Sequence, residues 1–190
     1  QPLIQTVFAC VVNFNRTGRK FSTKWRLQVS ELTHFDENGN PRMVDVSTKD
    51  ITQRIAVAQG RIRMQPETLE LIKTGNIHKG DVLSVAACAG IMAAKQTGNI
   101  IPMCHPLGID GCEISFAFNE TEPTIKVEAR VSVYARTGVE MEALTAVSAA
   151  CLTIYDMCKA YDKAMIISDI MLVSKSGGRS GEWQRKDDGR

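Results

Sequence analysis

The chain has 190 residues, of which 44% are hydrophobic, and its formal net charge at pH 7 is +2. This length and composition suit one globular domain with an ordinary hydrophobic core. No apolar stretch has the length of a membrane span, roughly 20 residues, and the small net charge argues against a basic face for nucleic acid. We therefore expect no transmembrane segment and no nucleic-acid partner.

The first thirty residues differ from the rest, because they contain basic residues and no acidic one. Three interpretations fit this segment: a processed start, a transit or leader sequence, or an extension in which residues 7–12 add a strand. These alternatives stay open at the level of sequence. We divide the chain into an extension of unknown role at 1–30, a main domain at 31–183 and a polar tail at 184–190.

Six cysteines occur, without a Cys-x-x-Cys motif and mostly inside apolar segments: Cys10, Cys88, Cys104, Cys112, Cys151 and Cys158. Free cysteine is among the most often buried residue types, which favours reduced core thiols over disulfides or zinc. Cys104-His105 resembles a fragment of a metal site, but no second Cys/His pair has the spacing of metal ligands. We expect no metal site.

The first predicted elements follow a turn signal at residues 36–41, Asp-Glu-Asn-Gly-Asn-Pro. Residues 43–47 are expected to form a short strand that places Asp45 between apolar neighbours. Residues 54–64 alternate well enough for a second strand, in which Gly60 permits a bulge or bend.

Two helices are predicted next. Residues 66–74 begin with proline and are followed by glycine, which is typical of a short helix. Residues 80–97 are helical in pattern and rich in alanine, so another helix or a sheet can approach closely. Lys79 precedes this helix and Lys95 closes it, about 24 Å apart along the axis. We expect these lysines to serve different ends of a site or different sites.

A rigid loop is predicted at residues 100–106, because each of its prolines restricts the preceding residue to extended backbone and so fixes His105. The later segments are read as a β-hairpin, a long helix and a final strand: residues 112–118 and 124–133, 137–160, and 164–173. The order of the elements predicts an α+β fold, a ferredoxin-like two-layer sandwich whose mostly antiparallel sheet has helices on one face.

The long helix carries an acid and a base near its end, Asp156 and Lys159. They are three residues apart and share a face, so they can act on one ligand atom or on each other. A surface ion pair is the plain alternative. The neighbouring side chains predict a poorly hydrated setting, in which a lysine pKa falls and an aspartate accepts protons: Leu152, Ile154, Met157 and Cys158.

Two further acids, Glu140 and Glu142, lie in the first turn of the same helix, where carboxylates also favour the positive end of the helix dipole. Glu142 lies nearly on the face of Asp156, but the rise of the helix separates them by about 21 Å. One small reactive centre cannot contact both ends. We expect either one extended site or, by preference, sites that combine the start of one helix with the end of its copy in another subunit.

Candidate anion-binding groups also lie outside the long helix. Residues 175–181, Lys-Ser-Gly-Gly-Arg-Ser-Gly, can surround a phosphate with backbone N–H groups, although a solvated tail fits them as well. Their spacing is not that of a P-loop. Lys79, ahead of a helix, is a second possible phosphate contact. His105 is the strongest candidate among the histidines, with a structural hydrogen bond as its alternative.

Seven short motifs occur in order along the chain, at residues 43–47, 79–81, 89–95, 101–106, 137–145, 155–160 and 175–178. Together they closely resemble the cyclic pyranopterin monophosphate synthase family, which acts second in molybdenum-cofactor biosynthesis. The resemblance runs from about Leu32 to Trp183. It implies a lyase that rearranges (8S)-3′,8-cyclo-7,8-dihydroguanosine 5′-triphosphate into cyclic pyranopterin monophosphate and releases diphosphate, so that 31–183 is a catalytic domain.

The resemblance also implies roles for single residues. A general acid/base pair for the proton transfers is expected at Asp156 and Lys159. Groups suited to the triphosphate and to the departing diphosphate are expected at Lys79, Lys95, His105 and Lys175. The purine-derived ring is expected to be held by Glu140 and Glu142. The pocket is expected to be lined, partly through backbone groups, by Met103-Cys104-His105 and Met141-Glu142. No redox cofactor or protein-bound metal is implied, although Mg²⁺ can accompany the triphosphate.

Members of the family form hexamers, built as trimers of dimers with sites between subunits, so the resemblance implies a homo-oligomer. The reduced core thiols expected for the cysteines favour a cytoplasmic location, with an organellar leader in residues 1–30 as the open alternative. The chain departs from the family pattern at positions that bear on pocket shape and subunit packing: Ala87, Cys88, Gln96 and the loop at 108–111.

Two functions of other classes stay open. A nucleotide-binding or scaffold subunit would use Asp156 and Lys159 as a structural pair. An RNA-binding ferredoxin-like module needs exposed aromatic residues on its sheet. Phe116 and Phe118 are the adjacent candidates for that role, and no basic-aromatic run accompanies them.

Overall fold

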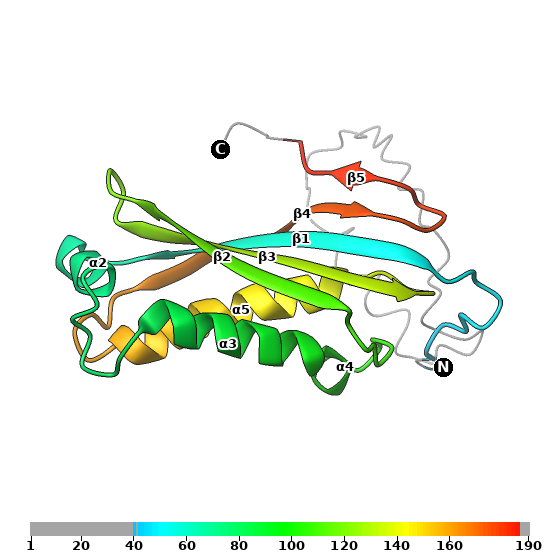
Figure 1. The fold of residues 1–190 in the computed structure, drawn as a ribbon, viewed down its shortest axis with the longest axis horizontal. Helices are drawn as coiled ribbons and strands as arrows, with labels where there is room; N and C mark the ends of the chain where they lie inside the picture. The colour runs from blue at the N-terminus through cyan, green and yellow to red at the C-terminus, as the bar shows by residue number, and fades with distance from the viewer. Residues whose placement is uncertain (1–39, 41, 187–190) are drawn as a thin grey trace, which may run out of the picture. The chain divides into compact units, whose positions relative to one another are not determined.

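The structure is a computed structural model and describes residue 40 and residues 42–186. Its strands are β1 (Thr52–Arg63), β2 (Gly111–Asn119), β3 (Thr124–Ala135), β4 (Ile166–Ser176) and β5 (Trp183–Gln184). Its helices are α2 (Pro66–Lys73), α3 (Val82–Lys95), α4 (Thr97–Ile100) and α5 (Glu140–Cys158). The strands form one antiparallel sheet in the order β2-β3-β1-β4-β5, and Figure 1 shows α3 and α5 side by side on one face of it. The predicted α+β, ferredoxin-like arrangement is confirmed.

The sheet buries one face because its central strands alternate apolar and polar residues. Ala58 and Ile62 of β1 and Val127 of β3 are fully buried beneath the helices. The opposite face carries polar side chains, among which Gln59 Nε2 donates a hydrogen bond to Glu128 Oε2 at 2.9 Å. Because side chains point to alternate faces along a strand, this pattern fixes which side of the sheet α3 and α5 cover.

Small residues let α5 lie close to both the sheet and α3. A Cβ atom on Gly60 of β1 would lie 2.6 Å from Val147 Cγ1, and one on Gly90 of α3 would lie 3.0 Å from the carbonyl oxygen of Ala146. The pairing of β1 with β4 is also irregular between Gln59 and Arg61, as expected for a bend at Gly60. The close approach predicted from the alanine-rich sequence of α3 is confirmed.

The short strand predicted at residues 43–47 is wrong. This segment is not part of the sheet, and its last residue lies in a turn. The Asp45 carboxylate accepts a hydrogen bond from the Ser47 N–H at 2.8 Å, so Asp45 is exposed rather than held between apolar neighbours. A short acidic side chain that satisfies its own backbone competes with strand pairing, which explains the difference.

The other predicted elements are present, with boundaries that match or are shifted by up to three residues. The helix predicted at 80–97 begins at Val82, because the Asp81 carboxylate caps it by accepting the N–H groups of Leu83 and Ser84. The short elements α4 and β5 were not predicted. The interpretations of residues 1–30 and most of the turn at 36–41 lie outside the described residues.

Helix α5 is the one helix among residues 42–186 that is long and apolar enough to cross a membrane, and half of its apolar window is buried inside the domain. That burial is typical of a core helix.

Cys151 and Cys158 lie on the buried side of α5, and burial raises the pKa of these thiols to about 12 and about 11. They are inert thiols, as predicted for core cysteines, whereas Cys88 on α3 is exposed.

Candidate active site

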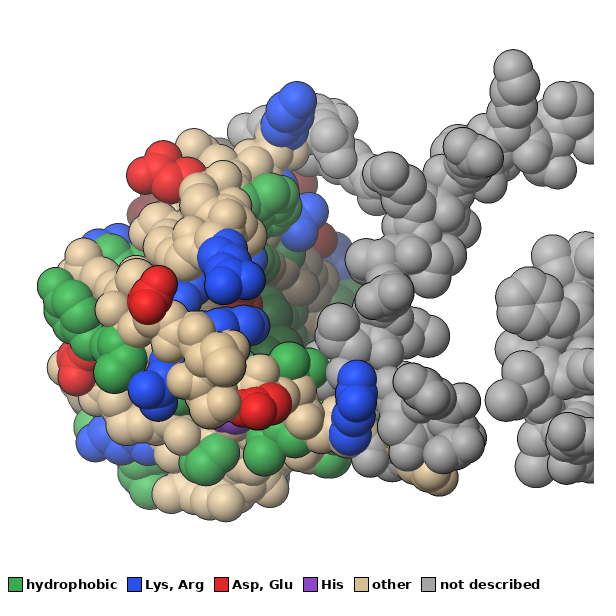
Figure 2. All heavy atoms as spheres, turned by 90° about the vertical axis from the view of Figure 1, so that its right-hand side faces the viewer, with side chains coloured by type: hydrophobic (Ala, Val, Ile, Leu, Met, Phe, Trp, Pro, Cys, Tyr) green, Lys and Arg blue, Asp and Glu red, His purple; other side chains and the backbone are tan. Residues whose placement is uncertain are grey.

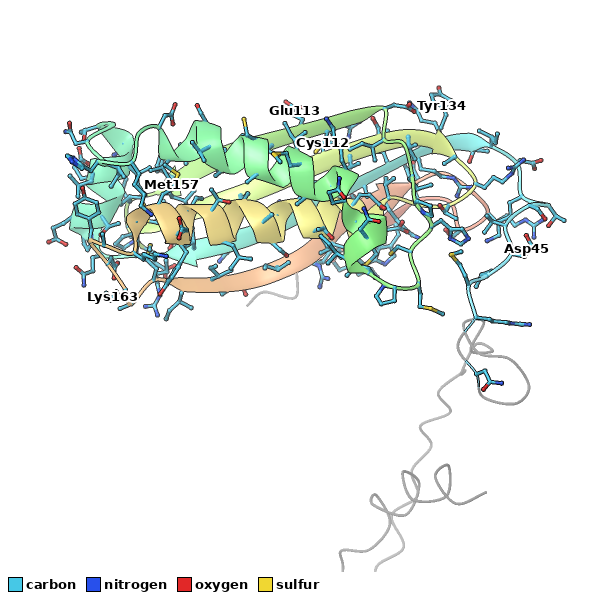
Figure 3. All side chains as sticks on the ribbon, turned by 90° about the horizontal axis from the view of Figure 1, so that it is seen from below. Asp45, Cys112, Glu113, Tyr134, Met157 and Lys163 are labelled. Carbon is cyan, nitrogen blue, oxygen red and sulfur yellow. The ribbon has the colours of Figure 1, made fainter. Side chains whose placement is uncertain are left out.

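The predicted site residues gather at two opposite ends of α5. Figure 3 shows Met157 and Lys163 at the end where α5 finishes, and Asp45 beyond the end where it starts. Glu140 and Glu142 lie in the first turn of α5, and Asp156 and Lys159 lie at its last turn. The separation inferred from helical rise is therefore present in the structure.

A cavity of about 550 Å³ opens at the start of α5. Basic side chains predominate in its wall: Lys49, Arg54, Arg136, Lys175 and Arg179. Asp50 and Glu140 are the acidic residues that line it. Figure 2, which faces this end of the domain, shows basic side chains around a hollow. The excess of positive charge suits a ligand with several negative charges.

Arg54 and the glycine loop shape one wall of this cavity. Arg54 donates hydrogen bonds to the carbonyl oxygens of Ala135 and Arg136, both at 3.3 Å. Gly177 and Gly178 have φ angles of +98° and +70°, and a Cβ on Gly178 would overlap the Arg54 guanidinium. Glycine is required here, because the loop has left-handed backbone and lies directly against the arginine. The loop predicted to bind phosphate thus faces the cavity.

Lys175 and Glu140 form an ion pair across the cavity, with Lys175 Nζ 2.9 Å from Glu140 Oε1. Lys175 also lies 3.2 Å from the hydroxyl of Ser180. Two other groups in the wall, the hydroxyls of Thr52 and Thr137, are buried and have no hydrogen-bond partner. The wall therefore contains one ion pair, between Lys175 and Glu140, and two buried hydroxyl groups without a hydrogen-bond partner.

A second, smaller cavity of about 140 Å³ surrounds the buried acid Glu142. Six of the predicted site residues line it together: Met103, Cys104, His105, Glu140, Met141 and Glu142. Glu140, Thr137 and Gly138 line both cavities, so the two adjoin. The grouping implied by the family resemblance is thus present as a contiguous pocket, formed by the first turn of α5 and the 100–106 loop.

Burial governs the electrostatics of this pocket. Glu142 is only 3% exposed, and its pKa is raised, first by desolvation and further by the nearby charge of Glu140. Desolvation and the charge of Glu142 likewise raise the pKa of the Cys104 thiol. Exclusion of water thus disfavours the charged forms of both groups.

His105 and Lys95 border the same end of α5. His105 Nε2 lies 2.9 Å from the carbonyl oxygen of Val44, which requires the proton on that nitrogen. This is the structural hydrogen bond considered as its alternative role, and His105 still lines the pocket of Glu142. Lys95 lines a neighbouring cavity of about 190 Å³ that Glu142 also borders. Lys95 thus belongs to this end and Lys79 to the other, as their spacing predicted.

At the end of α5, three charged side chains form one cluster. Lys159 Nζ lies 2.6 Å from Asp156 Oδ1, and Lys79 Nζ lies 3.2 Å from Asp156 Oδ2. Lys79 also donates to the main-chain carbonyl of Asp156 at 2.8 Å. Asp156 therefore has a lysine on each carboxylate oxygen, and the contact with Lys79 was not predicted from the sequence.

The poorly hydrated setting predicted for this cluster is wrong within one chain. The side chains of Asp156 and Lys159 are 58% and 52% exposed. Hydrogen bonds from Lys159 and then Lys79 lower the pKa of Asp156, and Asp156 raises the pKa of Lys159, opposite to the predicted fall. The apolar neighbours do not shield the pair, because Ile154, Met157 and Cys158 face the core and Leu152 is exposed.

The basic residues Lys49, Arg54 and Arg136 were missed as candidates. Arg54 and Arg136 come from segments more than 80 residues apart, and they meet because β1 and β3 pair from Thr52–Ala135 onward. Only the strand register brings them together. In the part of the chain that the structure describes, no group of three or more His, Cys, Asp or Glu side chains is arranged to hold a metal.

Comparison with known proteins identifies the family of the chain. The model of the MoaC family matches residues 43–178, and the chain belongs to that family. A cyclic pyranopterin monophosphate synthase of Desulfitobacterium hafniense is 63% identical over 159 residues, which are 83% of this chain and 96% of the relative. Proteins of the same name from Thermomicrobium roseum and Heliobacterium modesticaldum are 56% and 57% identical, over 84% and 82% of this chain and 96% and 98% of the relatives.

Proposed function

We propose that the chain is a lyase of molybdenum-cofactor biosynthesis, which converts (8S)-3′,8-cyclo-7,8-dihydroguanosine 5′-triphosphate into cyclic pyranopterin monophosphate and diphosphate. Membership of the MoaC family and 56–63% identity to relatives named cyclic pyranopterin monophosphate synthase support an enzyme of this activity. The observation that carries the proposal is the contact between a cationic cavity and a pocket with a buried carboxyl group. A ring that bears a triphosphate needs both.

The cationic cavity suits the triphosphate. Arg54, Arg136 and Lys175 present fixed positive charge where phosphate oxygens would lie, and the N–H groups of the glycine loop add neutral donors. A polyanion would compete with Glu140 for Lys175 and release their ion pair. Such preorganised charge stabilises the negative charge that develops as diphosphate leaves.

The adjoining pocket suits the purine-derived ring. The amidine-like edge of that ring carries N–H donors, and Glu142 and Glu140 offer carboxylate oxygens to accept them. A buried acid such as Glu142 gains most from this partner, because a bound cation-like edge offsets the desolvation that raises its pKa. Met103, Cys104 and Met141 supply apolar and thiol contacts for the ring faces.

The proton transfers are proposed for Asp156 and Lys159. Two lysines keep Asp156 ionised as a base, and Asp156 keeps Lys159 protonated as an acid, so the pair can accept one proton and donate another. In one chain these groups lie about 21 Å along α5 from Glu142. We therefore propose that each site joins the start of one α5 with the end of another, in a homo-oligomer whose expected form is a hexamer built as a trimer of dimers.

Ring opening and ring closure are proton-transfer steps, so the proposed mechanism uses no redox cofactor. Mg²⁺ bound to the triphosphate is compatible with the acidic side chains of the cationic cavity, Asp50 and Glu140.

The relatives are bacterial biosynthetic enzymes, which supports a cytoplasmic location. An RNA-binding role lacks support, because Phe116 packs against the core beneath the helices instead of facing outward with an aromatic partner.

The direct test is incubation of the full chain with the cyclised triphosphate intermediate, with diphosphate and the pterin product measured over time. We expect equal amounts of both products, and no reaction of unmodified GTP. Binding without diphosphate release would contradict the lyase and favour the nucleotide-binding or scaffold alternative.

A further inference from the structure

The loop that carries Lys79 reaches the end of α5 from a distant part of the chain. It joins α2 to α3 and is anchored by Ile77, which is 4% exposed. Gly80 follows Lys79 with a φ of +98°, a left-handed turn that directs the chain into α3. The side chain of Lys79 is half exposed, and its ammonium group lies against the carboxylate and the carbonyl oxygen of Asp156.

One side chain ties this loop to the segment that follows α5. The hydroxyl of Tyr161 accepts a hydrogen bond from the backbone N–H of His78 at 3.3 Å. Tyr161 is itself held to the helix, because its N–H donates to the carbonyl of Cys158 at 2.8 Å. Tyr161 thus connects the residue before Lys79 with the turn that carries Lys159.

Lys79 acts on Asp156 in two ways. Its ammonium group neutralises the carboxylate, and it also donates to the Asp156 carbonyl, one of the last four carbonyls of α5. Within α5 the last turn contains no basic residue, and Lys159 follows it as the C-cap. Lys79 therefore adds, from a distant loop, to the positive charge that Lys159 places at the C-terminal end of the helix.

We propose that Tyr161 is a positioning residue, whose hydroxyl holds the His78–Lys79 backbone so that Lys79 stays on Asp156. This rests on the proposed acid/base role of Asp156. Tyr161 touches no substrate in this role and acts through Lys79. Only the backbone N–H of His78 is used, so the imidazole of His78 is dispensable.

The proposal has a consequence for pH dependence. Lys159 and then Lys79 lower the pKa of Asp156, so a looser Lys79 moves that pKa back up toward its ordinary value. Activity that needs ionised Asp156 is then lost at a higher pH as the solution is acidified. The other charged or titratable groups around the cluster are Tyr155, Cys158, Lys159 and Asp162.

The test compares two Tyr→Phe variants of the full chain. Tyr161→Phe removes the hydroxyl that binds the His78 N–H, whereas Tyr155→Phe removes a hydroxyl that donates to the Lys163 carbonyl at 3.2 Å and does not touch the Lys79 loop. For Tyr161→Phe we expect kcat to fall about two- to tenfold, the effect of one lost hydrogen bond. The acid limb of the kcat profile should move to higher pH.

Tyr155→Phe and His78→Ala are expected to keep the kcat and pH profile of the unmodified protein. The loss caused by Tyr161→Phe should also disappear in a Lys79→Met background, because the hydroxyl then has no ammonium group to position. An unchanged acid limb in Tyr161→Phe, equal losses in both Tyr→Phe variants, or additive effects with Lys79→Met would each overturn the proposal.

Asp156→Asn separates failure of this inference from failure of the proposed function. Loss of turnover in Asp156→Asn with no effect of Tyr161→Phe refutes the positioning role alone. Normal turnover in Asp156→Asn refutes the acid/base role on which the positioning role rests.

Discussion

The two ends of α5 present the same residue types in opposite environments. At its start, Glu142 is buried in a pocket and desolvation raises its pKa. At its end, Asp156 is exposed and two lysines lower its pKa. One helix therefore offers an acid suited to recognising N–H donors and another that stays ionised for proton transfer.

The difference arises from what covers each end. The first turn of α5 is closed by the 100–106 loop and Leu107, which exclude water from Glu142. The exposed side of the last turn meets the Lys79 loop, whose contact with Asp156 is an exposed ion pair. Exposed ion pairs are weak and screened by water, so strong acid/base behaviour at this end requires a further surface that covers it. A second subunit would supply that surface.

The largest expected effect comes from the exposed end. Asp156→Asn or Lys159→Ala should lower kcat by about 10²- to 10⁴-fold, the contribution of a general acid or base, while assembly measured by light scattering stays intact. Asp169→Asn is a matched control, because Asp169 is an exposed acid that pairs with Arg61 at 3.9 Å away from both ends. Its φ of +52° is tolerated by asparagine. Near-normal product formation by Asp156→Asn would contradict a proton-transfer role for the end of α5.

The next effect concerns the cationic cavity at the start of α5. Arg54→Ala and Lys175→Ala should each raise KM for the triphosphate substrate by about tenfold or more, because each removes a charge-assisted phosphate contact. Arg61→Ala, on an exposed side chain outside the cavity, should leave KM unchanged. Equal KM values for all three variants would show that the cavity does not hold the phosphates.

A stability measurement sharpens the contrast in burial. The folded-state pKa of Glu142 lies above its unfolded value, so its ionisation destabilises the fold as pH rises past the unfolded value. Glu142→Gln should therefore stabilise the free protein near pH 7, with no gain near pH 4. Glu140→Gln should not stabilise, since it breaks the pair with Lys175. Denaturant unfolding at both pH values checks this, and a pH-independent change in Glu142→Gln would contradict it.

The local sequence pattern was enough to predict most of the fold and the distance between the two groups of site residues on α5. The helices and central strands follow from periodicity, and the distance between Glu142 and Asp156 follows from the rise of one helix. The hydration of Asp156 could not be predicted, because the apolar residues beside it in sequence face the core or the solvent on other sides of the helix.

Long-range contacts were also beyond the sequence pattern. Arg54 reaches the site through its register against β3, and Lys79 reaches Asp156 through a loop that follows α2. The strand expected at residues 43–47 failed because Asp45 satisfies the backbone locally. Each of these outcomes depends on which segments meet in space or on a side chain that bonds to its own backbone, and neither is visible in periodicity.

The most direct test of the divided site is subunit mixing. Glu142→Gln and Asp156→Asn chains, each inactive alone, would be dissociated, mixed in equal amounts and reassembled, with exchange verified by mass spectrometry. If each site joins two chains, about a quarter of the sites combine an intact Glu142 with an intact Asp156, so the mixture should recover about a quarter of unmodified activity. No recovery despite proven exchange would contradict a site shared between the start of one α5 and the end of another.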